Sequence, residues 1–241
     1  MTRNISLTIE GKVYSITVSD DQKALLAAAA AGRAVLGLWD PEKPEEMPWG
    51  VPYLAEKGQE TDRDLLERVV RRHAGLPWII GEGRRLWLRE LKAEDWIFIQ
   101  EFSQERDCPP AFSNKEAFLS YIHSQYRFYE YGLWGVIHRQ KDVLLGAAGI
   151  WDFKEGGLET GYWIRKPFRR QGYGQEAEEI VLDYAARHFQ GPVWAAIREE
   201  NLPSRRLAQK LGFVRKKTAD LGKEGNVFLY QLPERTFTDQ K

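Results

Sequence analysis

The sequence has a single cysteine and no net charge, and each of these shortages excludes a class of protein. Cys108 is the one cysteine among 241 residues, so the chain can form no internal disulfide and no zinc site made of several thiolates. The 35 Lys and Arg residues balance the 35 Asp and Glu residues, so there is no basic excess to hold a nucleic-acid backbone. We expect no nucleic-acid partner, and any phosphate site must be local.

Long apolar runs and metal-ligand spacings are also missing. No run approaches the roughly 18 apolar residues of a membrane span, and the first residues lack the apolar core of a signal peptide. The histidines stand singly, at His73, His123, His138 and His188, so we expect no metal. Hydrophobic residues make up 43% and charged residues 29% of the chain, the balance of a globular protein. We therefore expect a soluble, cytoplasmic protein with no membrane partner.

A polar, glycine-containing joint at residues 81–84 separates two patterns of elements. The first pattern predicts a small α/β domain over residues 1–82, in which we find no motif of known chemistry. Its expected elements are a hairpin over 5–18, a helix over 25–31, a strand over 34–38, a helix opened by a capping box of Thr61 and Asp64 and ended by Gly75, and a strand over 78–80.

The second pattern predicts a larger domain over residues 83–234, followed by a C-terminal tail at 235–241. Short strands dominate its middle, as in a meander, and helices precede and follow them. Its expected elements are a strand over 86–91, helices over 93–104 and 114–130, strands over 134–138, 144–151 and 158–164, a helix over 174–189, a strand over 193–197, a helix over 204–211 and a final strand over 227–232.

Two glycines lie where a predicted strand passes into a predicted helix, in the segment R-R-Q-G-Y-G at residues 169–174. Gly172 and Gly174 allow backbone conformations and close approaches that other residues do not. The amides that enter a helix point outward with the positive end of its dipole, and Arg169 and Arg170 add positive charge. The segment predicts a site for a diphosphate. It matches neither a dinucleotide-binding fingerprint nor a P-loop, and a plain strand-to-helix turn remains the alternative.

Two motifs carry a resemblance to a known family. The pattern Arg169-x-x-Gly172-x-Gly174 is similar to the Q/R-x-x-G-x-G/A coenzyme A loop of the GNAT superfamily of N-acetyltransferases. Residues 201–213 resemble the N-x-x-S-x-x-x-A-x-K-L-G-F helix of the ribosomal-protein N-acetyltransferase branch and its small-amine relatives. The resemblance covers residues 84 to 232 and leaves the first domain outside it.

The resemblance implies a fold, an activity and a cosubstrate. The fold is α/β (α+β), a mixed, mostly antiparallel sheet flanked by helices, in which the fourth and fifth strands separate and the pantetheine arm of acetyl-CoA lies between them. An amine then attacks the thioester directly, in a ternary complex of a monomeric or homodimeric enzyme. The acceptor is a protein N-terminus or a small amine. The residues that match the coenzyme site are Trp163, Ile164, Arg165, Arg169, Arg170, Gln171, Gly172, Tyr173, Gly174, Gln175, Asn201, Ser204 and Lys210.

The resemblance also implies catalytic roles. Glu159 matches the strand carboxylate that deprotonates the amine, and Glu155 at the preceding turn is a weaker candidate. Many relatives place a tyrosine on the last helix to protonate the leaving thiolate, but Ala208 occupies that position here. Ser204, one turn earlier, is the remaining hydroxyl, and a solvent proton is the alternative. Each role has a structural alternative: an edge salt bridge for Glu159, and helix capping for Ser204 and Asn201.

The early helices and the strand edges form the acceptor pocket in this family, and several aromatic residues are available for it here. The candidates are Tyr126, Phe128, Tyr129, Tyr131, Trp151 and Tyr162. Cys108, next to two prolines, is expected to be a loop residue without a covalent role. A second function stays open at this point: a GNAT fold that holds acyl-CoA as a sensor or interaction module without catalysis.

Overall fold

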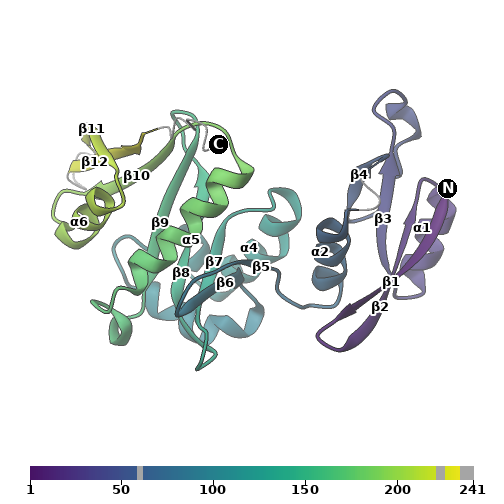
Figure 1. Cartoon of the computed structure of the whole chain (residues 1–241), viewed down its shortest axis with the longest axis horizontal. Coiled ribbons are helices and arrows are strands. Elements are labelled where there is room, and N and C mark those ends of the chain that lie inside the picture. Colours follow the sequence, from purple (N-terminus) through teal and green to yellow (C-terminus); the bar gives the residue numbers. More distant parts are fainter. Residues whose placement is uncertain (59–61, 221–225, 234–241) are drawn as a thin grey trace, which may run out of the picture. The chain divides into compact units, whose positions relative to one another are not determined.

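The computed structural model describes residues 1–58, 62–220 and 226–233, apart from the side chains of residues 127, 128 and 220. Thr61, the Phe128 side chain and the predicted tail at 235–241 lie outside this description. The chain forms two compact units, Met1–Trp78 and Ile79–Lys241, each with its own sheet (Figure 1). In the described part of the chain, no helix has both the length and the apolar character needed to cross a membrane.

The first unit is a four-stranded sheet in the order β1-β2-β3-β4, with the first pair antiparallel and the others parallel. Its elements are β1 (Thr2–Ile9), β2 (Lys12–Ser19), α1 (Gln22–Ala30), β3 (Ala34–Trp39), the short helix η1 (Pro44–Glu46), β4 (Leu54–Glu56) and α2 (Arg63–His73). The predicted hairpin is confirmed, and its two-residue turn has positive φ at Glu10 (52°) and Gly11 (77°), the geometry that joins twisted antiparallel strands.

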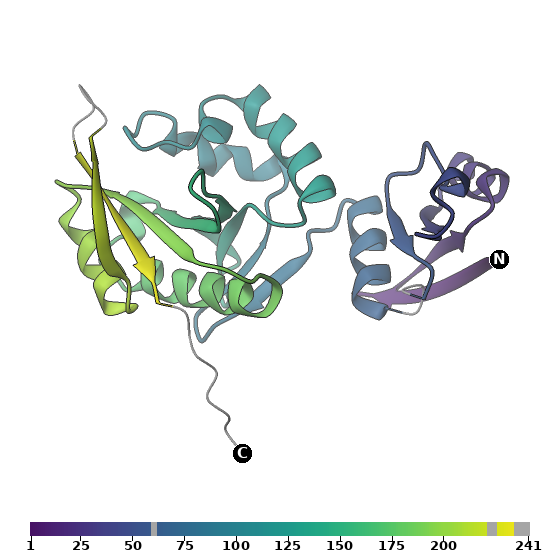
Figure 2. The same cartoon turned by 90° about the horizontal axis from the view of Figure 1, so that it is seen from above.

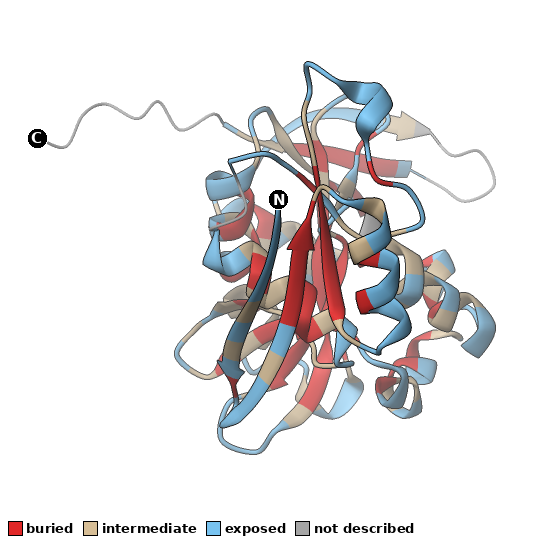
Figure 3. Ribbon diagram, turned by 90° about the vertical axis from the view of Figure 1, so that its right-hand side faces the viewer, coloured by how far each residue is buried: buried red, intermediate tan, exposed pale blue. Residues whose placement is uncertain are grey.

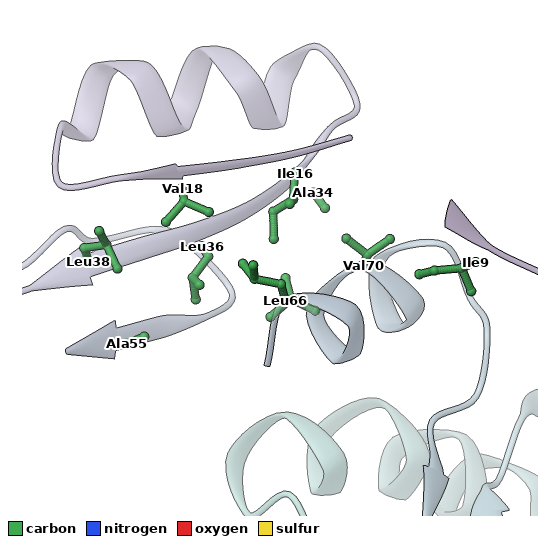
Figure 4. Close-up of a cluster of buried hydrophobic side chains, with 10 residues drawn as sticks. Ile9, Ile16, Val18, Ala34, Leu36, Leu38, Ala55, Leu66 and Val70 are labelled. Carbon is green, nitrogen blue, oxygen red and sulfur yellow. The ribbon is translucent and has the colours of Figure 1, made fainter. Parts of the chain in front are cut away.

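Alternation along the central strands gives this unit a core on each face of its sheet. Val35 packs with Leu25 of α1, whereas Leu36 and Leu38 pack with Leu66 of α2. Figure 4 shows the α2 side of this core, with Leu66 and Val70 directed toward the strands. In Figure 3 the second half of β2 and nearly all of β3 are red, whereas the edge strand β1 is mostly exposed.

One prediction for the first unit was wrong, and another involves a residue outside the described part of the chain. The predicted capping box rests on Thr61, which is not described, and the N-cap that the structure shows is Asp62, whose carboxylate accepts hydrogen bonds from the backbone amides of Asp64 and Leu65. Residues 78–80 were assigned to the first domain, but β5 (Ile79–Glu82) pairs with β6 (Leu86–Glu90) in the second sheet. A short apolar run gives no information on its strand partner, because pairing is set by residues far away in the sequence.

The second unit is an eight-stranded sheet in the order β11-β12-β10-β9-β8-β7-β6-β5. All neighbouring strands are antiparallel except β9 and β10. Its further strands are β7 (Leu133–His138), β8 (Val143–Asp152), β9 (Leu158–Ile164), β10 (Val193–Arg198), β11 (Val214–Asp220) and β12 (Asn226–Leu232). The predicted mixed, mostly antiparallel sheet is confirmed.

Helices cover both faces of this sheet. Its longer helices are α4 (Lys115–Phe128), α5 (Tyr173–His188) and α6 (Leu202–Lys210). Figure 2 shows the sheet with α5 on one face and α4 on the other. The predicted helix over 93–104 is divided into η2 (Ala93–Asp95), α3 (Trp96–Ile99) and η3 (Gln100–Phe102), and a further short helix, η4 (Pro110–Phe112), precedes α4.

The sequence prediction missed β11, an edge strand with the sequence VRKKTAD. Its charged residues interrupt any apolar alternation, which is how edge strands avoid pairing with other chains.

The first turn of α5 is held in place by Glu176, whose carboxylate accepts hydrogen bonds from the Arg85 backbone (2.5 Å), the Arg85 guanidinium (2.8 Å) and the Leu86 backbone (3.2 Å). Burial raises the pKa of Glu176, but these bonds outweigh it and the pKa is lowered.

A buried ion pair fixes the start of the helical layer opposite α5. The Arg89 guanidinium of β6 binds both carboxylate oxygens of Asp95, at 2.7 and 2.9 Å, and both side chains are at most 8% exposed. Asp95 also accepts a hydrogen bond from the Lys92 backbone amide at 2.8 Å. The pair therefore links the sheet to the turn from which α3 begins.

We predict that Asp95→Ala lowers the free energy of unfolding by about 3–5 kcal/mol, because it leaves the Arg89 charge buried without its partner. Denaturant unfolding followed by fluorescence measures this loss. Glu94→Ala, at the exposed neighbouring position, is the matched control and should change the free energy by less than about 0.5 kcal/mol. Equal effects of the two substitutions would contradict the role given to the ion pair.

Candidate active site

The sheet opens between β9 and β10. The two strands pair in parallel only at Leu158 with Val193 and Glu159 with Trp194. Beyond Glu159, β9 continues to Ile164 alongside β8 alone, and β10 continues beside β12 alone. The inner edges of the two strands therefore diverge from a closed end at Glu159, and their backbone groups face a gap.

A cavity of about 1450 Å³ occupies this gap. Its walls come chiefly from β9, β10, the first turns of α5, the length of α6 and the segment at residues 105–111, with further residues from α4 and from neighbouring strands. Most of the residues predicted for the coenzyme site line it, whereas Arg165 and Gln171 do not. The Arg165 guanidinium instead binds the Glu101 carboxylate at 2.6 and 3.0 Å and the Leu144 carbonyl at 2.9 Å.

The glycine loop has the backbone that its sequence predicts. Arg170 (φ 59°) and Gly172 (φ 80°) are left-handed, and Gly172 is the cap from which α5 starts at Tyr173. A Cβ at Gly174 would lie 2.7 Å from the Tyr162 ring, so only glycine fits there without a shift of that ring. The free backbone amides in the first turn of α5, a helix of 16 residues, therefore lie at one end of the gap.

Arg169 holds this loop and is already paired. Its Nε donates to the Ile164 carbonyl at 2.6 Å, and its guanidinium forms an ion pair with Glu105. Arg170, next to the start of α5, and Lys210, at the end of α6, also line the cavity. They supply local positive charge that the zero net charge of the chain conceals.

Glu159 lies at the closed end of the gap and is half-buried. Burial raises the pKa of its carboxyl, and hydrogen bonds from the Trp151 side chain and the Ala196 backbone only partly oppose this. Among the ion pairs of the described residues none involves Glu159, so the edge salt bridge considered as its alternative is not formed there. Glu155, the weaker candidate, forms a surface ion pair with Lys217.

The opposite wall carries two hydroxyls. Ser204, in the first turn of α6, lies 3.1 Å from the Tyr162 hydroxyl of β9. The Ser204 backbone amide donates to the Asn201 side chain at 3.2 Å, so Asn201 caps α6. Burial raises the pKa of Tyr162, which therefore keeps its proton at neutral pH. Both hydroxyls line the cavity.

Glu178 also lines the cavity, and the sequence prediction overlooked it. It is 3% exposed, and its Oε2 lies 2.8 Å from the Thr160 hydroxyl. Burial raises the pKa of this carboxyl to about 8. The available signal was its place on the apolar face of α5, between Ala177 and Val181, where a carboxylate is out of pattern.

The segment at residues 101–107 crosses the gap on the face opposite α5. The Asp107 carbonyl accepts a hydrogen bond from the Trp163 ring of β9 at 2.8 Å, and its carboxylate pairs with Arg198 of β10. One residue thus joins the two strands that the gap separates. Sequence motifs could not reveal this, because the three residues belong to distant segments with no shared pattern.

The predicted acceptor aromatics divide into two groups. Trp151 and Tyr162 line the cavity. The other three do not line the cavity. Tyr126 is buried and donates to the Leu133 carbonyl, Tyr129 is exposed, and Tyr131 donates to Asp152 at 2.6 Å. Cys108 is half-buried, and burial together with Glu105 raises its pKa, which disfavours a thiolate.

Comparisons with known proteins agree with this geometry. Residues 85–214 match the family described as "Acetyltransferase (GNAT) domain". The chain is 25% identical over 138 residues to the uncharacterized N-acetyltransferase YnaD of Bacillus subtilis, a match that covers 55% of this chain and 81% of that protein. Among solved structures, it is similar to a putative ribosomal-protein-serine acetyltransferase from Vibrio cholerae (25% identity, TM-score 0.53, 64% of this chain and 97% of that one).

A second solved structure shares the fold alone. It is a chimera of the Vibrio cholerae spermidine N-acetyltransferase SpeG with hSSAT, at 15% identity and a TM-score of 0.54, and the match covers 62% of this chain and 95% of that one. All of these matches are shorter than the chain, and the family match begins at residue 85, so it leaves the first unit outside it.

We predict that Glu178 makes the fold less stable as pH rises. The folded chain keeps the carboxyl proton up to a pKa of about 8, whereas the unfolded chain releases it near 4.5. Between these values the unfolded state binds fewer protons, so the contribution is complete at low pH and is lost as pH rises, with a limiting slope of about 1.4 kcal/mol per pH unit. Glu178→Gln should therefore gain stability relative to the wild type as pH rises toward 8.

Denaturant unfolding across this pH range measures the difference. Asp183→Asn removes an exposed carboxylate from the same helix and should leave the difference from the wild type independent of pH. A flat difference for Glu178→Gln would show that the carboxyl is ionised in the folded chain.

Proposed function

Because the chain belongs to the GNAT acetyltransferase family, we propose that it transfers the acetyl group of acetyl-CoA to a primary amine in the gap between β9 and β10. The observation that carries this proposal is the gap itself, which runs from the glycine loop at the start of α5 to Glu159 at its closed end. The acceptor is a protein N-terminus or a small amine. The similar proteins include both kinds, a putative ribosomal-protein-serine acetyltransferase and a spermidine acetyltransferase chimera.

Three features support binding of the donor here. The amides that open α5 at Gly172 suit a diphosphate, and Arg170 supplies a nearby positive charge. The diverging edges of β9 and β10 offer backbone groups to an extended chain with amides of its own, as when a strand is added to a sheet. Acetyl-CoA has both parts, and it supplies the activated acetyl group.

Glu159 is the proposed base. An amine is protonated at neutral pH and must lose a proton before its lone pair can form the new C–N bond. The raised pKa of Glu159 makes it a stronger base than an ordinary carboxylate. The Trp151 side chain and the Ala196 backbone favour its charged form at the closed end of the gap.

Ser204 is the proposed acid. When the C–S bond breaks, the sulfur leaves as a thiolate, a proton from the Ser204 hydroxyl converts it to the thiol, and solvent returns a proton to the serine. Tyr162, 3.1 Å from Ser204, places a second proton donor next to it. Many relatives have a tyrosine where this chain has Ala208, and alanine has no proton to donate. Ser204, on the same helix, offers a hydroxyl in its place.

A thiol-release assay over a panel of amines and N-terminal peptides tests the function, and Glu159→Gln tests the base. We predict that this substitution lowers kcat by about 100-fold or more, the usual contribution of a general base, and leaves the affinity for acetyl-CoA unchanged. In the wild type, kcat should fall as pH decreases through a pKa above 4.5, and the variant should lack this limb.

Glu155→Gln is the matched control and should keep full activity, because Glu155 is engaged with Lys217 at the surface. A larger loss at Glu155 than at Glu159 would exchange their roles. Thiol release that stays at background with every amine would contradict the proposed transfer.

We also predict that reversing the charge of Arg169 and Arg170 to Glu weakens acetyl-CoA binding by roughly 10- to 100-fold, because charge-assisted contacts with phosphate are lost. Isothermal titration calorimetry measures the change. Arg187→Glu, at the exposed far end of α5, is the control and should bind as the wild type does. Unchanged binding in the double variant would place the diphosphate elsewhere.

A further inference from the structure

The carboxyl of Glu178 is a buried polar group that the proposed mechanism does not use. Its Oε2 is engaged with Thr160, but its Oε1 has no hydrogen-bond partner within the described residues. An unpaired oxygen at this depth costs free energy, so native proteins satisfy nearly all such atoms with protein, water or a ligand. Since Glu178 lines the cavity, a bound molecule can supply the missing partner.

The hydrogen bonds of Thr160 decide what kind of partner is missing. Its hydroxyl carries one proton and lies 2.8 Å from Glu178 Oε2 and 3.1 Å from the Gly149 carbonyl. Thr160 has one proton for these two acceptors, and neither of its contacts reaches Oε1 of Glu178. The partner of Oε1 must therefore come from the cavity. A hydroxyl suits this oxygen whether or not it carries the carboxyl proton, because a hydroxyl can both donate and accept a hydrogen bond.

The place of Glu178 along the gap decides which part of the donor molecule arrives there. Thr160 is the first residue of β9 beyond the pairing with β10, so Glu178 stands at the closed end. The glycine loop lies beyond the other end of β9. From Ile164 to Thr160 the strand spans roughly 13 Å at about 3.3 Å per residue, a distance along which an extended pantetheine arm can run. The acyl group therefore reaches the end where Glu178 lies.

Resting on the proposed donor site, we propose that this end of the gap accepts, besides acetyl, short acyl groups that carry a hydrogen-bond donor, and that Glu178 selects them over aliphatic acyl groups of the same length. An acetyl group is small enough to leave a water on Oε1. A longer aliphatic chain displaces that water and leaves Oε1 unsatisfied, whereas a hydroxyl on the chain replaces it.

Butyryl-CoA and 3-hydroxybutyryl-CoA are the matched probes, because they differ by one hydroxyl. Calorimetry on the full chain gives their affinities without an acceptor amine, and acetyl-CoA is measured in every variant. We expect the wild type to bind the hydroxylated donor about tenfold more tightly, the value of one satisfied buried hydrogen bond. Glu178→Leu should abolish this preference, and Glu178→Gln, which keeps an acceptor oxygen, should retain part of it.

Asp183→Leu makes the same kind of change on the exposed face of α5 and should preserve the wild-type ratio. Equal affinities in the wild type, tighter binding of butyryl-CoA, or exclusion of both four-carbon donors while acetyl-CoA binds would overturn the inference. The wild-type ratio decides even if Glu178→Leu fails to fold. Failure of acetyl-CoA itself to bind the wild type would instead overturn the proposed function.

Discussion

The separation of β9 from β10 is the constraint on which the second unit depends. Each strand keeps a full antiparallel partner on its outer side, β8 for one and β12 for the other, so the sheet remains continuous around the opening. Helix α5 supports β8 and β9, whereas the core of α6 packs against β10 and β12. The two halves are thus built separately, and the Asp107 contacts with Trp163 and Arg198 join them across one face.

Two acidic residues of α5 show how position, rather than residue type, sets the chemistry of this site. Glu176 and Glu178 are two residues apart on one helix, and their pKa values shift in opposite directions. Glu176 meets a guanidinium and two backbone amides, which favour its charged form. Glu178 meets one hydroxyl in an apolar layer, which favours its neutral form. The first positions the helix, and the second gives the cavity a neutral polar wall.

The elements that sequence reasoning located are those with local physical signals. The left-handed Gly172, the Asn201 cap and the apolar face of α5 are encoded within a few residues, so the loop and both helices were predicted correctly. Pairing between distant segments has no such signal. Three features were missed for this reason, because each depends on residues far away in the chain. They are the pairing of β5 with the second sheet, the edge strand β11 and the ion pair of Arg165 with Glu101. The catalytic assignments rest on the resemblance and stay predictions.

The contact between Arg169 and Glu105 links the glycine loop to the segment that crosses the gap. Arg169 stands at the glycine loop, and Glu105 lies two residues before Asp107, in the segment that crosses the gap. An anion bound at the loop would compete with Glu105 for the same guanidinium. It would then act on the segment at residues 101–107 through one shared side chain, without requiring any rearrangement of the sheet.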